Sequence, residues 1–123
     1  MARILLVEDD SNVLLLLEHV LRDDGHDVDL AVTVQQAQSC LRQHRYDLVV
    51  ADGKLPDGTG MQIGDAANTA GVRVLIVTGF AFQLPSEELR RFDYLLKPLR
   101  PAELLRAVER KLAADSPPAA APQ

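Results

Sequence analysis

Short apolar runs alternate with longer amphipathic stretches five times along this chain. The runs are short and apolar, which is typical of strands buried inside a sheet. We predict strands at residues 3–8, 27–32, 46–51, 72–77 and 94–96. The second of these is more polar than the others, and we expect it at the edge of the sheet. Strands that alternate with helices imply a parallel sheet with helices on both faces.

Capping residues mark the bounds of the first two helices. Asp10 or Ser11 can cap a helix that runs to about residue 24 and ends at Gly25, a residue suited to a left-handed backbone. Thr33 and Gln36 have the spacing of a capping box, in which Thr33 bonds forward and Gln36 bonds back. This box predicts a second helix that continues to about residue 44.

Three more helices are predicted in the second half of the chain. A turn at residues 55–60 leads into a helix of poor propensity at residues 61–69, and Pro85 starts a short helix to about residue 91. Pro101 suits the first position of the last helix. The buried stripe of that helix is predicted to contain Leu104, Leu105, Val108 and Leu112.

The length of 123 residues suits one compact domain with a real hydrophobic core. We predict that residues 1–114 form this domain and that residues 115–123 are a disordered Pro/Ala-rich tail or linker stub. No apolar run approaches the roughly 18 residues that span a membrane, and the N-terminus lacks a signal-peptide pattern. A single cysteine, Cys40, suits a reducing cytosol. We therefore expect a cytoplasmic protein.

The charge balance excludes one class of partner. The formal net charge is −5, with 18 acidic and 13 basic residues. Proteins that bind nucleic acids usually carry a basic excess that neutralises phosphates. We therefore expect no direct contact of this domain with nucleic acid, and no contact with a membrane.

Reactive or polar groups follow four of the five predicted strands. The first strand ends in Glu8 and Asp9, and the third, fourth and fifth end in Asp52, Thr78 and Lys97. Ligands of such sheets bind beyond the carboxyl ends of the strands. If the strand order is 2-1-3-4-5, these four strands lie side by side and their ends converge on one small site.

Three carboxylates in one small site require positive charge. Two unit charges about 4 Å apart repel by roughly 4 kcal/mol at an effective dielectric constant of about 20. Mg²⁺ suits such a site because it prefers one or two carboxylates, water and a phosphate oxygen, and Lys97 adds a compact ammonium group. Aspartate can attack phosphorus to form an aspartyl phosphate. Catalysis of phosphoryl transfer is mostly positioning and charge neutralisation.

The sequence resembles the CheY-like receiver domain of two-component response regulators over residues 3 to about 113. Four segments carry the resemblance: RILLVEDD, YDLVVADGKLPDGTG, VRVLIVTG and DYLLKP. Each is moderately specific alone, but together they occur in the right order and each closes a predicted strand. The resemblance implies a flavodoxin-like (βα)5 fold, a doubly wound α/β sandwich whose parallel five-stranded sheet has the order 2-1-3-4-5.

The resemblance also implies roles for the residues at the strand ends. Asp52 would be phosphorylated, Asp9 would bind Mg²⁺ directly, and Glu8 would bind it through water. The backbone carbonyl of Lys54 would complete the protein ligands of the metal.

On the same basis, Thr78 would hydrogen-bond the phosphoryl group and Lys97 would pair with it. The peptide bond between Lys97 and Pro98 is usually cis in this family. Tyr94 occupies the position of the aromatic switch residue. The phosphoryl group would draw Thr78 inward and let Tyr94 rotate, which changes an exposed face.

The spacing between the site residues departs from the usual family pattern, and two further residues resemble positions that tune the lifetime of the phosphate. The spacing from Asp52 to Thr78 and from Thr78 to Lys97 is shorter than usual, which predicts shortened third and fourth helices. Lys54 and Phe80 occupy positions that resemble the family's tuners of phosphate lifetime. The bulk of Phe80 suggests that it excludes the attacking water and prolongs the phosphorylated state.

Each of these residues also has a purely structural interpretation. Asp52 could be a turn residue, Glu8 and Asp9 could be acids that favour a helix N-terminus, and Tyr94 could belong to the core. Likewise, Thr78 could be a plain strand-end hydroxyl and Lys97 a solvated surface lysine. Cys40 is interpreted as a small buried helix residue rather than a redox sensor. His19, His26 and His44 lack metal-ligand spacing and are expected at the surface.

Three classes of function follow. The first is a signalling phosphoacceptor, not an enzyme beyond its own phosphorylation and autodephosphorylation, fed by a histidine kinase or histidine phosphotransfer protein. Its downstream target would be a protein or an output domain in another chain, and the fold allows a homodimer. The second is a module of the same fold that binds a partner without phosphorylation. The third is an enzyme, such as a phosphatase or a flavin-binding protein, but the chain offers no second catalytic base or cofactor loop.

Overall fold

The five predicted strands form one parallel sheet in the computed structural model, which describes residues 2–79 and 92–113. The strands are β1 (Arg3–Val7), β2 (Asp27–Ala31), β3 (Leu48–Asp52), β6 (Arg73–Thr78) and β7 (Asp93–Leu96). Their order is β2-β1-β3-β6-β7, which confirms the predicted order 2-1-3-4-5. The polar strand β2 lies at an edge, as expected, and every residue of the central strand β3 is buried.

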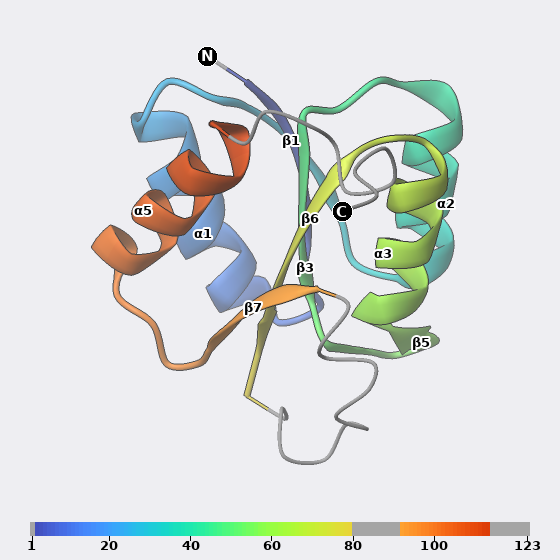
Figure 1. The fold of residues 1–123 in the computed structure, drawn as a ribbon. Coiled ribbons are helices and arrows are strands. Elements are labelled where there is room, and N and C mark those ends of the chain that lie inside the picture. Colours follow the sequence, from blue (N-terminus) through green and yellow to red (C-terminus); the bar gives the residue numbers. More distant parts are fainter. Residues whose placement is uncertain (1, 80–91, 114–123) are drawn as a thin grey trace.

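Four helices cover the two faces of this sheet in the part of the chain that the structure describes. On one face lie α1 (Ser11–Asp23) and α5 (Pro101–Leu112), and on the other lie α2 (Val34–Gln43) and α3 (Gly60–Thr69) (Figure 1). Alternate residues of each strand point to opposite faces of a sheet. In β1, Leu5 packs in the core beneath α2 and α3, whereas Leu6 packs in the core beneath α1 and α5. The architecture is therefore the flavodoxin-like sandwich.

The caps of the first two helices follow the sequence with one difference. The Asp10 side chain accepts hydrogen bonds at the start of α1, and Gly25 after its end has a φ of 90°. At the start of α2, the Thr33 hydroxyl accepts the Gln36 N–H at 3.0 Å, as predicted. The capping box is not complete, because the Gln36 side chain accepts the N–H of Val32 at 2.9 Å rather than the N–H of Thr33.

The second half of the chain also differs in detail from the prediction. The predicted turn at residues 55–60 overlaps a small antiparallel hairpin of β4 (Lys54–Leu55) and β5 (Gly58–Thr59). In α5, Leu104 and Val108 are buried, but Leu105 and Leu112 are only half-buried. The predicted helix at residues 85–91 and the predicted tail at residues 115–123 lie outside the described residues.

Two further findings concern the periphery. His26 was expected at the surface, but its side chain is mostly buried and its Nδ1 atom accepts the N–H of Ala2 at 3.2 Å. Among the described residues, every helix is too short or too polar to cross a bilayer.

Candidate functional site

The sheet brings the ends of four strands together. Glu8 and Asp9 follow β1, Asp52 and Thr78 end β3 and β6, and Lys97 follows β7. These strands are neighbours, and their register places Asp52 beside Val77. The predicted convergence of these side chains at the carboxyl edge of the sheet is confirmed.

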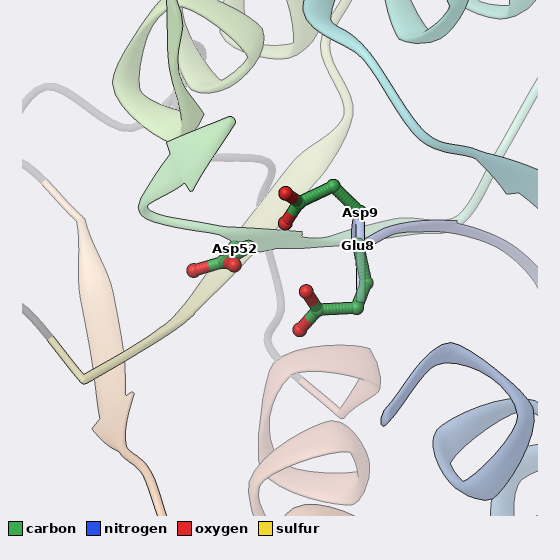
Figure 2. A group of neighbouring side chains, drawn as sticks. All are labelled: Glu8, Asp9 and Asp52. Atoms are coloured by element: carbon green, nitrogen blue, oxygen red, sulfur yellow. The ribbon is translucent and has the colours of Figure 1, made fainter. Parts of the chain in front are cut away.

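Three carboxyl groups face a common space at this edge (Figure 2). One oxygen from each of Glu8, Asp9 and Asp52 lies within 4.8 Å of the others. Glu8 is 2% exposed and Asp52 is 5% exposed, whereas Asp9 is exposed to solvent. Two of the carboxylates are therefore held away from bulk water. Their mutual repulsion is less screened in this buried position than it would be in solvent.

Lys97 bridges the two buried carboxylates. Its Nζ atom lies 2.5 Å from Oε1 of Glu8 and 3.2 Å from Oδ2 of Asp52. Burial acts to lower the pKa of Lys97, but the bonds to Glu8 and Asp52 outweigh burial, so the pKa of Lys97 lies above its ordinary value. The peptide bond between Lys97 and Pro98 is cis, as predicted.

Glu8 has a partner for each of its oxygens. Oε1 accepts from Lys97, and Oε2 accepts the backbone N–H of Asp10 at 3.1 Å. A buried carboxylate keeps its charge at low cost only when it is paired and hydrogen-bonded. Glu8 therefore holds Lys97 over the site, while the exposed side chain of Asp9 keeps free access to solvent.

Glycines let the backbone approach closely around Asp52. A Cβ atom on Gly53 would lie 2.7 Å from Oγ1 of Thr78, and one on Gly60 would lie 2.3 Å from the carbonyl oxygen of Asp52. Neither distance leaves room for a side chain. Thr78 is fully buried, so its hydroxyl group is fixed next to the backbone that follows Asp52.

The remaining predicted residues lie around this cluster. The N–H of Lys54 points toward Oδ1 of Asp52 at 3.4 Å, and the Lys54 side chain is exposed. Tyr94 lies in β7 and is 43% exposed. Phe80 lies outside the described residues. Lys97 directly contacts both Glu8 and Asp52. The functional roles assigned to all of these residues remain predictions.

The donor set fits a hard divalent cation. Three carboxylates meet one ammonium group, which leaves two negative charges without a matching positive charge among the described residues of the site. Mg²⁺ prefers oxygen ligands, typically one or two carboxylates together with water and phosphate oxygens. The cluster can therefore hold Mg²⁺, which in turn can bring phosphate oxygens next to Asp52.

Sequence reasoning missed one residue near the site. Asp57 lies in the hairpin that follows Asp52, and its carboxylate accepts two backbone N–H groups at the start of α2. The sequence shows Asp57 only as a turn residue before a glycine. Its partners lie more than 20 positions away, and no local pattern specifies them.

Comparison with known proteins identifies the class that this fold and site define. The family model described as "Response regulator receiver domain" matches residues 4–109, and the chain belongs to this family. Receiver domains are phosphoryl-accepting signalling modules of two-component systems and are not typical enzymes.

Individual relatives are consistent with this assignment. The chain is 30% identical over 115 residues to the alginate biosynthesis transcriptional regulatory protein AlgB of Pseudomonas aeruginosa, covering 89% of this chain and 26% of that protein. The chain spans between about a quarter and about half of the length of the full-length relatives it matches.

Two solved receiver domains have closely similar structures. The receiver domain of the sensor histidine kinase PA1611 of Pseudomonas aeruginosa was solved with a magnesium ion coordinated in its active-site cleft. It has a TM-score of 0.82 and 30% identity, covering 92% of this chain and 98% of that one. The non-phosphorylated HemR receiver domain of Leptospira biflexa has a TM-score of 0.83 and 32% identity, covering 95% of this chain and 98% of that one.

Proposed function

We propose that this domain accepts a phosphoryl group on Asp52 from a histidine kinase or histidine phosphotransfer protein in a reaction that requires Mg²⁺. The arrangement of Lys97, which bridges Glu8 and Asp52 next to a cluster of three carboxylates, carries the proposal. A binding module that does not use phosphorylation would not need this buried charge. The intact cluster therefore argues against the alternative function.

The residues at the site divide the work of phosphoryl transfer. A carboxylate oxygen of Asp52 attacks phosphorus and forms the new P–O bond, while the bond from phosphorus to the donor's leaving atom breaks and that atom keeps the electron pair. Lys97 neutralises charge on the phosphoryl oxygens, and the Thr78 hydroxyl donates a hydrogen bond to one of them.

The acidic residues hold the metal in this proposal. Asp9, Asp52 and the Lys54 carbonyl bind Mg²⁺ directly, and Glu8 binds it through water. The bound ion supplies positive charge that lets a phosphate group approach the carboxylates. The solved PA1611 receiver domain, which holds magnesium in its cleft, supports this assignment.

The signal leaves the site through Thr78 and Tyr94. A phosphoryl group adds negative charge and acceptor oxygens at Asp52, which draws the Thr78 hydroxyl toward it. Tyr94, exposed in β7, then rotates inward and changes the face that a partner contacts. The target is a downstream protein or an output domain in another chain, and the changed face can also support a homodimer. Lys54 and Phe80 set the rate of autodephosphorylation.

The setting of the domain follows from the same family. Residues 1–114 form the receiver domain, as the family match to residues 4–109 supports, and residues 115–123 form a linker or tail. We place this chain in the cytoplasm, because its single cysteine, Cys40, suits a reducing compartment. The acidic net charge of −5 argues against direct binding of the domain to nucleic acid.

The test is phosphorylation with a small donor. The protein is incubated with phosphoramidate and Mg²⁺, and its intact mass is measured alongside Asp52→Asn and the control Asp65→Asn, an exposed aspartate in α3. We expect one added phosphoryl group in the wild type and in Asp65→Asn, and none in Asp52→Asn or in the presence of EDTA. An adduct that persists in Asp52→Asn would place the acceptor elsewhere. No adduct in the wild type despite Mg²⁺ binding would favour the partner-binding function.

A further inference from the structure

The hairpin of residues 54–59 links the acidic cluster to helix α2. Lys54 pairs with Thr59 and Leu55 pairs with Gly58, so Pro56 and Asp57 form the turn. In Figure 1 the hairpin lies at the carboxyl edge of the sheet, below α3. A pair of two-residue strands is not stable by itself. The position of the hairpin therefore depends on what holds its two ends.

The turn end of the hairpin is fixed to α2 by Asp57. Its Oδ1 atom accepts the N–H of Val34 at 2.7 Å, and its Oδ2 atom accepts the N–H of Gln35 at 3.0 Å. These are the first two residues of α2, whose N–H groups have no partner within the helix. The two backbone bonds hold the pKa of Asp57 below its ordinary value, as expected for a carboxylate at a helix N-terminus.

Helix α2 thus has two separate caps at its N-terminus. Thr33 accepts the N–H of Gln36 from within the same segment, and it has no hydrogen bond to the hairpin among the bonds observed. Asp57 covers Val34 and Gln35 from a segment more than 20 residues further along the chain. Only the second cap connects the helix to the hairpin.

The other end of the hairpin borders the acidic cluster. The N–H of Lys54 points toward Asp52, and the N–H of Gly60 donates to the carbonyl of Gly53 at 3.1 Å. The Leu55 side chain between the two ends is buried in the core beneath α2 and α3. A displacement of the turn is therefore transmitted along a short, packed segment to the backbone of Lys54.

We propose that Asp57 is a positioning residue for the metal site, because it clamps the hairpin onto α2 and so holds the backbone of Lys54 beside Asp52. This inference rests on the proposed function, in which the Lys54 carbonyl is a ligand of Mg²⁺. Asp57 itself does not touch the metal. It sets the affinity for Mg²⁺ through the position of the hairpin.

The direct test is the Mg²⁺ dissociation constant, measured by isothermal titration calorimetry on the whole chain. Loss of a group that supports a metal ligand typically weakens metal binding by about 10-fold to 100-fold. For Asp57→Ala we expect the Mg²⁺ dissociation constant to rise by about 10-fold, the lower end of this range. Asp57→Asn should lose less, because an amide oxygen still accepts one of the two N–H groups.

Thr33→Ala is the matched control. It removes the other cap from the same end of α2 and leaves the hairpin attached through Asp57. We expect Thr33→Ala to lower the urea midpoint of unfolding but to leave the Mg²⁺ dissociation constant unchanged. If Thr33→Ala weakens Mg²⁺ binding as much as Asp57→Ala does, general loosening of α2 explains the effect and the inference is wrong.

A second readout uses the phosphorylation rate with phosphoramidate. In Asp57→Ala, the Mg²⁺ concentration for half-maximal rate should rise by about 10-fold, whereas the rate at saturating Mg²⁺ should change less. Phosphorylation of Asp57→Ala with wild-type Mg²⁺ dependence overturns the inference and leaves the proposed function intact. If the wild type binds Mg²⁺ but takes up no phosphoryl group, the proposed function fails, and the calorimetry still decides the role of Asp57.

Discussion

The two edges of the sheet carry ion pairs of opposite character. Toward the amino edge, Asp29 accepts from Arg3 at 2.9 Å and from the Tyr46 hydroxyl at 2.6 Å, and the Arg3 guanidinium lies 5.3 Å from the centre of the Tyr46 ring. This carboxylate has a matching cation and a further donor. At the carboxyl edge, three carboxylates share one ammonium group from Lys97.

The difference shows which edge was shaped for stability and which for function. The network around Asp29 is balanced in charge and partly open to solvent, so it contributes to stability without requiring a ligand. In the cluster around Asp52, two of the three carboxylates are buried and negative charge is in excess, which costs stability until a cation binds. We infer that the protein tolerates repulsion at the carboxyl edge because that repulsion prepares a metal site.

The largest expected effect comes from removing the only ammonium group that contacts the buried carboxylates among the described residues. Lys97→Met leaves Glu8 and Asp52 buried without a cation and should lower the free energy of unfolding by about 3 kcal/mol in Mg²⁺-free buffer. Urea unfolding followed by circular dichroism measures the loss. Lys111→Met is the control, because Lys111 forms a surface pair with the well-exposed Asp93 and should lose less than about 1 kcal/mol. Equal losses in the two variants would show that Lys97 does not offset buried charge.

A smaller pair of effects should have opposite signs at the two edges. In EDTA, Asp52→Asn removes one of the crowded charges and should stabilise the fold by about 1 kcal/mol. Asp29→Asn removes a paired charge and should destabilise the fold by about 1 kcal/mol. Saturating Mg²⁺ should stabilise the wild type and reduce the advantage of Asp52→Asn. A loss of stability in Asp52→Asn in EDTA would contradict the proposed excess of negative charge.

The smallest effect tests the balance at the amino edge. Tyr46→Phe removes a hydroxyl that donates to Asp29 and should cost about 0.5 kcal/mol near neutral pH. The bond from Tyr46 is the largest cause that holds the pKa of Asp29 below its ordinary value of 3.8. A carboxyl group whose pKa is lowered in the fold contributes its full stability above its ordinary pKa of 3.8. This contribution is lost as the pH falls through the lowered pKa. The difference between wild type and Tyr46→Phe should therefore shrink below pH 3.8.

The exposed Tyr94 provides the control for this substitution. Tyr94→Phe removes the equivalent hydroxyl from the edge strand β7. We expect no change in the free energy of unfolding, either near neutral pH or in the acid range. A difference between wild type and Tyr46→Phe that stays constant through the acid range would show that the hydroxyl stabilises the fold independently of the charge on Asp29. Burial and the bond to Asp29 both raise the pKa of Tyr46, so its hydroxyl remains a donor throughout this range.

The sequence by itself determined the sheet and the residues at its carboxyl edge. Buried strands need continuous apolar runs, and residues that interrupt such a run at its end stand out in the sequence. Asp52 and Thr78 were found in this way because each lies at the end of a strand. The position of Gly25 and the cap by Asp10 were also predictable, because these signals are local.

Only the tertiary structure decided which side chains meet. Lys97 contacts Glu8 rather than the neighbouring Asp9, because the side chains of consecutive residues leave the end of β1 in different directions (Figure 2). Asp57 caps a helix in another segment, and Tyr46 finds Asp29 on another strand. Periodicity records which residues are buried, but it carries no information on pairs that lie many residues apart. Packing of the helices against the sheet brings these pairs together.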